Sequence, residues 1–459
     1  MRHFRFKPPI EILLLVRVSL LLAAFVSLAP AQSAFDKAEF AARRARVCQK
    51  IGDSVAMVLA NPKHIYPLKF RQSPDFYYLT GIEEPDALLV LDGRSKRSTI
   101  FAIKKAGFRI ATEGPGLLDL PDAPAVYGID RIVLFDETFW LNFGSSGPGG
   151  KIYLPMTPPD DLEYSRGEMR FEDADKAAHP VLPENSRYSR LIAKVRQMQP
   201  QLDLADINPI LDQLRWVKTP YEIERMRVSG KIGAEGVKEA IRGTKPGMYE
   251  YELEAAARFV FTRRGARGDA FTPIVASGPN TVILHYTNNN RRMNAGDVVY
   301  MDYGSDYDYY VSDITRTWPV SGKFTPEQEK MYRCIFEART AIIAAIKPGA
   351  KVSNLQDAAA VVYKKYGFEK EFEAFGRYVG HFVGLSVHDV GDEDWAFVPG
   401  VVFNVEPLIQ NDQQKIHLRL EDTVLVTAAG SENLTAAVPA ELNAVYALIR
   451  QPAIGAAVR

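Results

Sequence analysis

The sequence predicts a two-domain protein of the mixed α/β class. Its length of 459 residues allows two or three domains, strand-like and helix-like patterns alternate from residue 36 to about 203, and the rest of the chain contains an internal repeat. With 47% hydrophobic and 24% charged residues, the composition is that of an ordinary globular protein, which excludes the disordered and fibrous classes. The formal net charge of zero argues against nucleic acid as a partner, because no basic excess is available to neutralise phosphates.

The amino terminus has the pattern of a secretory signal peptide. Basic residues precede an uncharged apolar run at 18–29, and an Ala-Pro-Ala triplet ending at Ala31 has the small residues of a cleavage site. We therefore expect residues 1–31 to be removed and the protein to be exported, as a periplasmic or secreted protein with no stable membrane association. The apolar run is too short to span a hydrocarbon core of roughly 30 Å. An uncleaved membrane anchor is the alternative, because Glu11 and Arg17 are atypical of a signal peptide.

Residues 32–204 are predicted to form the first, smaller α/β domain. A helix over 36–51 begins with Asp36 as its N-cap residue, and another helix lies near 189–198. Between these helices the sequence contains five strand-like apolar runs, at 54–60, 86–93, 98–103, 131–135 and 151–156. No motif in this domain carries chemistry by itself.

Two segments of the first domain are not assigned to a helix or strand. The acidic, proline-containing stretch 157–175 is predicted to be a loop. The segment 66–89 is rich in aromatic residues, which either line a binding surface or pack on one another as a surface loop.

The second domain is predicted for residues 205–459, and a strong helix start marks its beginning. Thr219 is a suitable N-cap residue, Pro220 takes the first helical position, and Glu222 completes a capping box. The helix that follows has an apolar stripe on one face, which predicts a buried helix rather than a site.

An internal repeat occupies most of the second domain. Each copy opens with Lys-Pro-Gly, at Lys245 and Lys347, and continues through a loop and a helix. Each copy then supplies a histidine, an acid at the end of a strand and a second acid on the next strand, at offsets of 102 to 108 residues. The pairs are His285 and His388, Asp302 and Glu406, and Asp313 and Glu421. A repeat of this kind folds so that equivalent groups face one another, so we expect the four carboxylates to converge on one point.

The first pair of acids lies in a predicted hairpin over 298–317. An apolar strand ends at Asp302, and the β-rich run that follows contains Asp313. If the turn centres on Tyr307 and Asp308, the two carboxylates lie opposite each other on one face, with Cβ atoms about 4.5–5.5 Å apart. An arbitrary pair of this kind is more often a solvated hairpin tip. The repeat favours the buried cluster here.

Four carboxylates in one cavity repel one another unless cations neutralise them, since even one unpaired buried carboxylate is costly. Two divalent ions are therefore expected, because hard oxygen ligands favour such ions. His381 has no counterpart in the first copy of the repeat, and it is the candidate nitrogen ligand. His285 and His388 are expected to act beside the ligands, as proton relays or hydrogen-bonding groups.

The motifs LHYT, MDYG, SDITRTWPVSGKFTPEQ, GHFVGLSVHDVG, NVEPL and LRLEDTVLVT resemble those of the pita-bread metallopeptidases of family M24, which includes aminopeptidase P, prolidase and methionine aminopeptidase. The resemblance covers about 205–450, and FRQSPDFY at 70–77 extends it into the amino-terminal domain typical of aminopeptidase P and prolidase. It implies a pita-bread catalytic domain with an internal pseudo-twofold repeat, preceded by a smaller α/β domain. It also implies a homo-oligomer, either a dimer or a tetramer.

By the same resemblance, the metal ligands are Asp302, Asp313, His381, Glu406 and Glu421. Asp302 and Asp313 hold one ion, His381 and Glu406 hold the second together with Asp313, and Glu421 helps to bridge the two. The resemblance implies two Mn²⁺ ions per chain. One imidazole among oxygen ligands also suits cobalt, iron or zinc.

The activity implied by the resemblance is that of an exported Xaa-Pro aminopeptidase, which releases the first residue from peptides with proline second. Glu406 transfers a proton in this scheme, and His285 and His388 stabilise the tetrahedral intermediate. Arg419 matches an arginine that the family uses near the substrate. Arg377 replaces a substrate-contacting histidine of the family, which leaves the strictness of the proline preference open.

Two other functions remain as alternatives. Arg377 or Arg419 could hold a terminal carboxylate, which would make the protein a prolidase that cuts only dipeptides. A metal-free pita-bread binding module is the alternative of a different class, although such a module is expected to lose ligands.

For the proline ring, Tyr378 and Phe382 beside His381 are expected to form an apolar wall.

Overall fold

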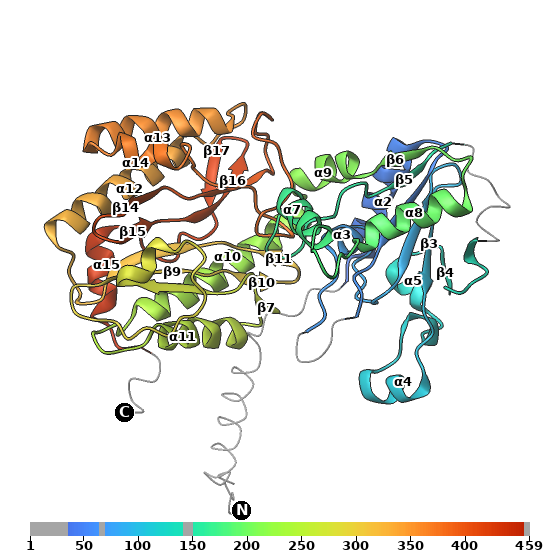
Figure 1. Cartoon of the computed structure of the whole chain (residues 1–459), viewed down its shortest axis with the longest axis horizontal. Coiled ribbons are helices and arrows are strands. Elements are labelled where there is room, and N and C mark those ends of the chain that lie inside the picture. Colours follow the sequence, from blue (N-terminus) through green and yellow to red (C-terminus); the bar gives the residue numbers. More distant parts are fainter. Residues whose placement is uncertain (1–34, 64–68, 141–149, 454–459) are drawn as a thin grey trace, which may run out of the picture.

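The computed structural model describes residues 35–63, 69–140 and 150–453, which form two α/β parts side by side (Figure 1). The predicted signal peptide and its cleavage site lie outside these residues, so export stays a prediction. Within the described ranges, no helix is both long enough and apolar enough to cross a membrane.

The amino-terminal part is built on a six-stranded mixed sheet in the order β4-β3-β2-β1-β5-β6. Strands β1, β2 and β3 form an antiparallel meander, β4 and β5 flank it in parallel pairs, and β6 extends it. The strands are β1 (Val55–Leu59), β2 (Leu88–Asp92), β3 (Arg97–Ala102), β4 (Arg131–Leu134), β5 (Ile152–Leu154) and β6 (Leu204–Asp206). The five predicted strands are confirmed, and the sheet continues through β6, beyond the predicted domain end at residue 204.

Helices cover this sheet and connect its strands. They are α2 (Lys37–Ile51), α3 (Pro74–Thr80), α4 (Gly107–Glu113), α5 (Ala123–Tyr127), α7 (Arg166–Ala177), α8 (Arg187–Met198) and α9 (Asn208–Trp216), with a 3₁₀ turn η1 (Leu117–Asp119). Asp36 caps α2 as predicted, since its side chain accepts from two backbone N–H groups. The predicted loop over 157–175 is wrong from residue 166 on, because Ser165 and Glu168 form a capping box that starts α7.

The second part consists of two similar halves. The first half contains helices α10 and α11 and the sheet β12-β9-β8. The second half contains helices α12 and α13 and the sheet β13-β16-β17. The helices are α10 (Pro220–Ile241), α11 (Glu250–Arg263), α12 (Pro326–Ala345), α13 (Val352–Tyr366), α14 (Glu369–Ala374), α15 (Leu442–Ile449) and η2 (Gly278–Val282). The strands are β7 (Gly268–Asp269), β8 (Ile274–Ser277), β9 (Val298–Asp302), β10 (Ser305–Tyr307), β11 (Tyr310–Val311), β12 (Thr315–Pro319), β13 (Val402–Val405), β14 (Leu408–Asn411), β15 (Ile416–Arg419), β16 (Asp422–Thr427) and β17 (Gly430–Asn433).

The two halves follow the predicted repeat. Helices α11 and α13 are each followed by a glycine with positive φ, Gly265 and Gly367, which lie at the same offset from their Lys-Pro-Gly motifs. The halves join where the backbone N–H of Glu421 donates to the carbonyl of Thr315, at 3.0 Å. The acids that precede β12 and β16 are thereby brought to one place.

The predicted register of the hairpin over 298–317 is wrong. Asp302 pairs with Thr315, and the tip turns at Asp308 and Tyr309, both of which have positive φ. The turn therefore lies one residue later than predicted, so Asp313 is two residues nearer the tip than the position opposite Asp302. The chain closes tightly there, because a Cβ on Gly304 would lie only 1.7 Å from a carbonyl oxygen on the other side of the hairpin.

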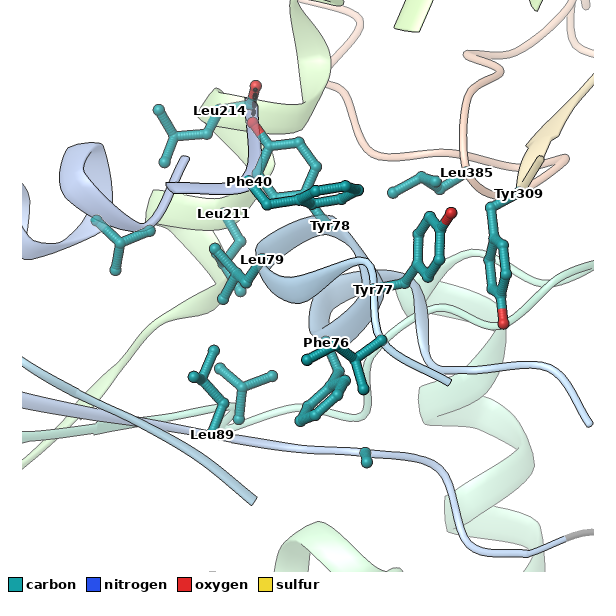
Figure 2. Packing of buried hydrophobic residues seen from close by; sticks show 14 of the residues in the cluster. Phe40, Phe76, Tyr77, Tyr78, Leu79, Leu89, Leu211, Leu214, Tyr309 and Leu385 are labelled. Atoms are coloured by element: carbon teal, nitrogen blue, oxygen red, sulfur yellow. Dashed lines mark hydrogen bonds between the residues drawn. The ribbon is translucent and has the colours of Figure 1, made fainter. Parts of the chain in front are cut away.

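An apolar cluster joins the two parts, and helix α3 lies at its centre (Figure 2). All seven residues of α3 are buried. The ring of Tyr77 stacks on that of Tyr309 at the hairpin tip, with centroids 3.5 Å apart, and Leu385 from the loop before β13 also packs into the cluster. The described part of the aromatic segment 66–89 is thus core at the domain interface, neither a binding surface nor a separate surface loop.

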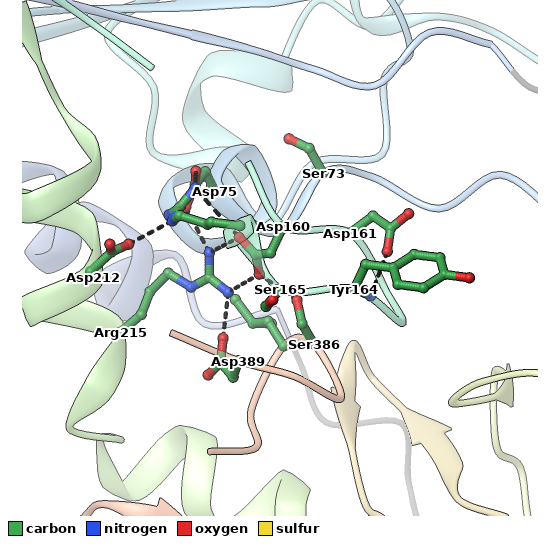
Figure 3. A network of polar contacts seen from close by, with 12 residues as sticks. Ser73, Asp75, Asp160, Asp161, Tyr164, Ser165, Asp212, Arg215, Ser386 and Asp389 are labelled. Atoms are coloured by element: carbon green, nitrogen blue, oxygen red, sulfur yellow. Dashed lines mark hydrogen bonds and ion pairs between the residues drawn. The ribbon is translucent and has the colours of Figure 1, made fainter. Parts of the chain in front are cut away.

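A buried set of ion pairs, here called the interdomain network, lies beside this cluster (Figure 3). Arg215 on α9 contacts Asp75 on α3 at 2.8 Å, Asp160 at 2.6 Å, and Asp389 on the loop before β13. Burial by itself would raise the pKa of Asp160, but Arg215 and Arg166 lower it to about 2, so this carboxylate is ionised at neutral pH. The network therefore ties a loop of the second part to the first.

We predict that Arg215→Met lowers the free energy of unfolding by about 3–5 kcal/mol, because it leaves buried carboxylates without their shared cation. The measurement is chemical denaturation of the purified protein. Arg227→Met is the matched control, since Arg227 pairs with Glu432 at the surface and should contribute at most about 1 kcal/mol. Equal losses in the two variants would contradict this account of the interdomain network.

Candidate metal centre

Five side chains meet where the two halves of the second part join. Asp302 ends β9, Asp313 precedes β12, Glu406 directly follows β13, Glu421 directly precedes β16, and His381 lies on the loop before β13. Each of the four carboxylate residues is at most 7% exposed. The predicted convergence of the acids on one buried point is therefore observed.

The imidazole of His381 faces three of the carboxylates. Its Nε2 lies 3.4 Å from Asp313 Oδ2, 3.8 Å from Glu421 Oε1 and 4.0 Å from Glu406 Oε2. Asp313, His381 and Glu421 each offer one ligand atom, and these atoms all lie within 4.8 Å of one another. One ion could reach all three.

Arg419, which was predicted near the substrate, lies within the carboxylate cluster. Its guanidinium pairs with Asp302, and its Nη1 donates to Glu406 Oε1 at 2.7 Å. Burial opposes the charge on Arg419, but the carboxylates hold its pKa well above the usual range. Arg419 therefore neutralises part of the cluster, and its role in substrate binding stays a prediction.

Electrostatic repulsion dominates the chemistry of the cluster. Burial raises the pKa of Asp313 well above its usual value, and the neighbouring Asp302 and Glu406 raise it further. Burial and the same neighbours also raise the pKa of Glu421, and Asp313 adds to this effect. Additional positive charge bound in the cluster would offset this effect and favour the ionised forms of Asp313 and Glu421.

The donor set fits divalent cations. Asp302 Oδ1 and Asp313 Oδ1 are buried, and neither atom has a hydrogen-bond partner among the residues that the structure describes. Buried carboxylate oxygens of this kind are costly unless they bind a cation. Oxygen ligands with one imidazole suit Mn²⁺ and similar ions, and His381, Glu406 and Glu421 complete the set that would hold them.

The surroundings of His381 orient it as a ligand. Its Nδ1–H donates to the carbonyl oxygen of Phe382 at 3.1 Å, and this bond leaves Nε2 as the lone-pair nitrogen toward the carboxylates. Gly380 lets the loop approach β13 so closely, because its φ is 137° and a Cβ there would lie 1.7 Å from the carbonyl oxygen of Asn404.

Sequence reasoning missed three residues that hold the ligands. The Thr315 hydroxyl and the Asn404 amide each donate to a different oxygen of Glu421. The Thr423 hydroxyl lies 3.2 Å from Asn404 Oδ1 and accepts from the backbone N–H of Asp313 at 3.0 Å. All three lie two positions from a predicted ligand, and side chains two positions apart on a strand share a face, so this spacing could have identified them.

The two paired histidines differ in their surroundings. The ring of His388 lies edge-on to that of His381, with centroids 4.4 Å apart, and its Nδ1 lies 2.9 Å from a carboxylate oxygen of Glu168 on α7. His285 is exposed in the turn after η2. Among the described residues, no hydrogen bond or ion pair joins His285 to the carboxylate cluster, so the predicted symmetry of the two histidines is not seen in their contacts.

Arg377 lies between α14 and His381 in the chain, and its ion pairs are with acids outside the carboxylate cluster. Its guanidinium pairs with Asp357 on α13 at 2.9 Å, and its Nε lies 3.8 Å from Glu373 on α14. Its own φ is 58°, a conformation that is uncommon for a side chain of this size. The predicted contact between Arg377 and a substrate is not tested by these interactions.

The two residues of the predicted apolar wall lie in different surroundings, and the wall itself stays a prediction. Tyr378 lies beside the cluster, since burial and the carboxylates of Glu406 and Glu421 raise the pKa of its hydroxyl well above the usual value. Phe382 instead packs into the core, edge-to-face with Phe403 at a centroid distance of 5.3 Å. Tyr378 and Phe382, four positions apart in the chain, therefore lie against the carboxylate cluster and in the core, respectively.

The chain matches the model of metallopeptidase family M24 over residues 224–428 and that of the aminopeptidase P N-terminal domain over residues 40–139. It is 31% identical to the Xaa-Pro aminopeptidase of Escherichia coli K12, over 91% of this chain and 100% of that relative. Among solved structures, it resembles aminopeptidase P from E. coli with the inhibitor Pro-Leu, with a TM-score of 0.75 and 29% identity over 93% of this chain and 100% of that one. Proline aminopeptidase P II from Yersinia pestis gives the same TM-score and identity, over 90% of this chain and 99% of that one.

The chain belongs to metallopeptidase family M24. Within this family it has the two-domain organisation of aminopeptidase P, because an amino-terminal domain of that type precedes the pita-bread domain. The predicted fold class and the predicted class of enzyme, a metallo-aminopeptidase, are confirmed. Divalent metal binding and a peptide substrate follow from the family.

We predict that Asp313→Asn lowers the bound metal and the peptidase activity together, because Asp313 is expected to contact both ions. Elemental analysis after reconstitution with Mn²⁺ should find two ions per wild-type chain and fewer in the variant. Asp308→Asn is the control, since Asp308 pairs with Arg225 at the tip of the same hairpin and should not affect the metal. Full metal content in Asp313→Asn would show that this residue is not a ligand.

Proposed function

We propose that this protein is an exported Xaa-Pro aminopeptidase that uses two divalent ions, expected to be Mn²⁺, to release the first residue from peptides with proline second. The observation that carries the proposal is the meeting of four buried carboxylates and one imidazole in an M24 chain with an aminopeptidase P N-terminal domain. Relatives named Xaa-Pro aminopeptidase, which match nearly end to end, support it. We further expect a dimer or tetramer without stable membrane association.

The chemistry that we assign to the site uses the bound ions and three side chains. Divalent ions held by the cluster would lower the pKa of water and polarise the scissile carbonyl. Glu406, fixed by Arg419, takes a proton from the attacking water and passes it toward the leaving nitrogen. His388, which lies against His381, stabilises the charge that develops on the carbonyl oxygen. His285 is assigned to positioning the peptide.

Proline preference follows from the chemistry of the bond that is cut. The nitrogen of this bond belongs to the proline ring and has no N–H, and the ring fixes φ near −65°, so clefts that hydrogen-bond this nitrogen handle the substrate poorly. A selective site needs an apolar surface for the ring and a donor for the carbonyl beyond it. Tyr378 supplies ring surface beside Glu406, and an arginine, Arg377 or Arg419, is the assigned donor.

The decisive experiment compares Ala-Pro, Ala-Pro-Ala and Ala-Ala-Ala as substrates of the Mn²⁺-loaded enzyme. We expect the highest kcat/KM for Ala-Pro-Ala, because its proline fits the site and its chain continues beyond the dipeptide. Fastest cleavage of Ala-Pro would identify a prolidase instead. Equal or better cleavage of Ala-Ala-Ala would reject proline preference. A protein that binds no metal on reconstitution and cleaves none of the three peptides would favour the binding module.

Export is tested by sequencing the amino terminus of the protein recovered outside the cytoplasm. We expect it to begin at Gln32, because the Ala-Pro-Ala triplet ends at Ala31. Ala31→Tyr is the matched control, since a large residue at this position should block cleavage and leave the precursor. A wild-type chain that begins at Met1 and sediments with membranes would support the uncleaved anchor.

A further inference from the structure

The amino-terminal part reaches the catalytic site through the segment 160–168, which joins β5 to α7. The backbone N–H of Val387 donates to the carbonyl of Leu162 at 2.9 Å. The backbone N–H and hydroxyl of Thr272 donate to Glu163 at 2.8 and 2.9 Å. The segment thus contacts the loop before β13 in the second half and Thr272 in the first half, so it touches both halves of the second part.

Glu168 extends this contact to the active site. Its Oε2 and Oε1 lie 2.9 and 3.1 Å from Nδ1 of His388. An ionised carboxylate only accepts hydrogen bonds, so the proton of this bond is on Nδ1. The ring of His388 in turn lies edge-on to His381, at an interplanar angle of 73°. Direct contacts therefore connect a helix of the amino-terminal part with the candidate nitrogen ligand.

The carboxylate of Glu168 is itself held in place. The backbone N–H and the hydroxyl of Ser165 both donate to its Oε2, each at 2.7 Å, within the capping box of α7. Burial would raise the pKa of Glu168, but the hydrogen bonds from His388 and Ser165 lower it to about 2. The capping box uses only Oε2, whereas both oxygens lie within hydrogen-bond distance of His388, so capping alone does not account for the arrangement.

We propose that Glu168 is a positioning residue for the peptidase reaction, which holds the ring of His388 through its Nδ1–H and so keeps Nε2 turned toward the substrate. This inference rests on the proposed function, in which His388 acts on the peptide carbonyl. Orientation matters because an imidazole ring that is not held can turn, and only one orientation presents Nε2 to the carbonyl oxygen. The amino-terminal domain is then part of the catalytic site through one carboxylate on α7.

Two variants of Glu168 test this proposal. Glu168→Gln keeps a neutral acceptor and the capping box, since Gln also serves at this position, whereas Glu168→Leu removes the acceptor. On Ala-Pro-Ala we expect kcat to fall by about 10-fold in the Gln variant and further in the Leu variant, with metal content and KM unchanged. In a His388→Ala background, Glu168→Leu should lower kcat no further, because the group that it positions is gone.

A control and a second readout separate positioning from a general structural effect. Glu172→Gln removes an exposed carboxylate one turn further along α7 and should leave kcat unchanged. Nitrogen NMR of the metal-free protein, labelled at its 7 histidines, should show His388 protonated on Nδ1 in the wild type, and this signature should be lost in Glu168→Leu.

The outcomes distinguish this inference from the proposed function. An unchanged Nδ1 signal of His388 in Glu168→Leu, or a full additional loss of kcat when Glu168→Leu is combined with His388→Ala, would overturn the positioning role. A wild-type enzyme that cleaves no Xaa-Pro peptide would overturn the proposed function, and the NMR signature would still decide whether Glu168 holds the Nδ1–H of His388.

Discussion

Four carboxylates held at one buried point are the constraint on which the rest of this structure depends. Removing one such charge from water is costly, and each like-charged neighbour adds repulsion. The fold responds with fixed positive charge and donors: Arg419 pairs with two of the acids, and Thr315 and Asn404 donate to Glu421. Among the described residues, Asp302 and Asp313 each have a buried carboxylate oxygen without a donor, and there we expect the divalent cations of an M24 enzyme to bind.

Duplication of one α/β unit explains how a chain assembles such a cluster. Each half supplies a strand that ends in an acid and a second acid before the next strand, and the halves meet along the bond between Glu421 and Thr315. Residues two positions from the ligands share their face of the strand, which is why the groups that fix the ligands come from the same short segments. His381 stands outside this symmetry because it lies on the loop before β13.

That loop depends on the other domain. Arg215 holds Asp389, Leu385 packs into the apolar cluster around α3, and Glu168 contacts His388. The two polar contacts, Arg215 with Asp389 and Glu168 with His388, need both partners in place, because an unpaired buried charge would be strongly unfavourable. The amino-terminal domain therefore supports the geometry of the site, although the metal ligands all come from the second domain.

The sequence by itself determined the class of the protein and the five candidate ligands. Strand-end acids and capping boxes such as that of Thr219 are local patterns, and the offsets of a repeat can be counted along the chain. The capping box of Glu168 was equally local, and the helix that it starts could have been predicted. Tertiary structure alone decided the turn at Asp308, the burial of Phe382 in the core and the bond between Glu168 and His388. That bond joins residues 220 positions apart, and no local pattern records which distant segments will pack together.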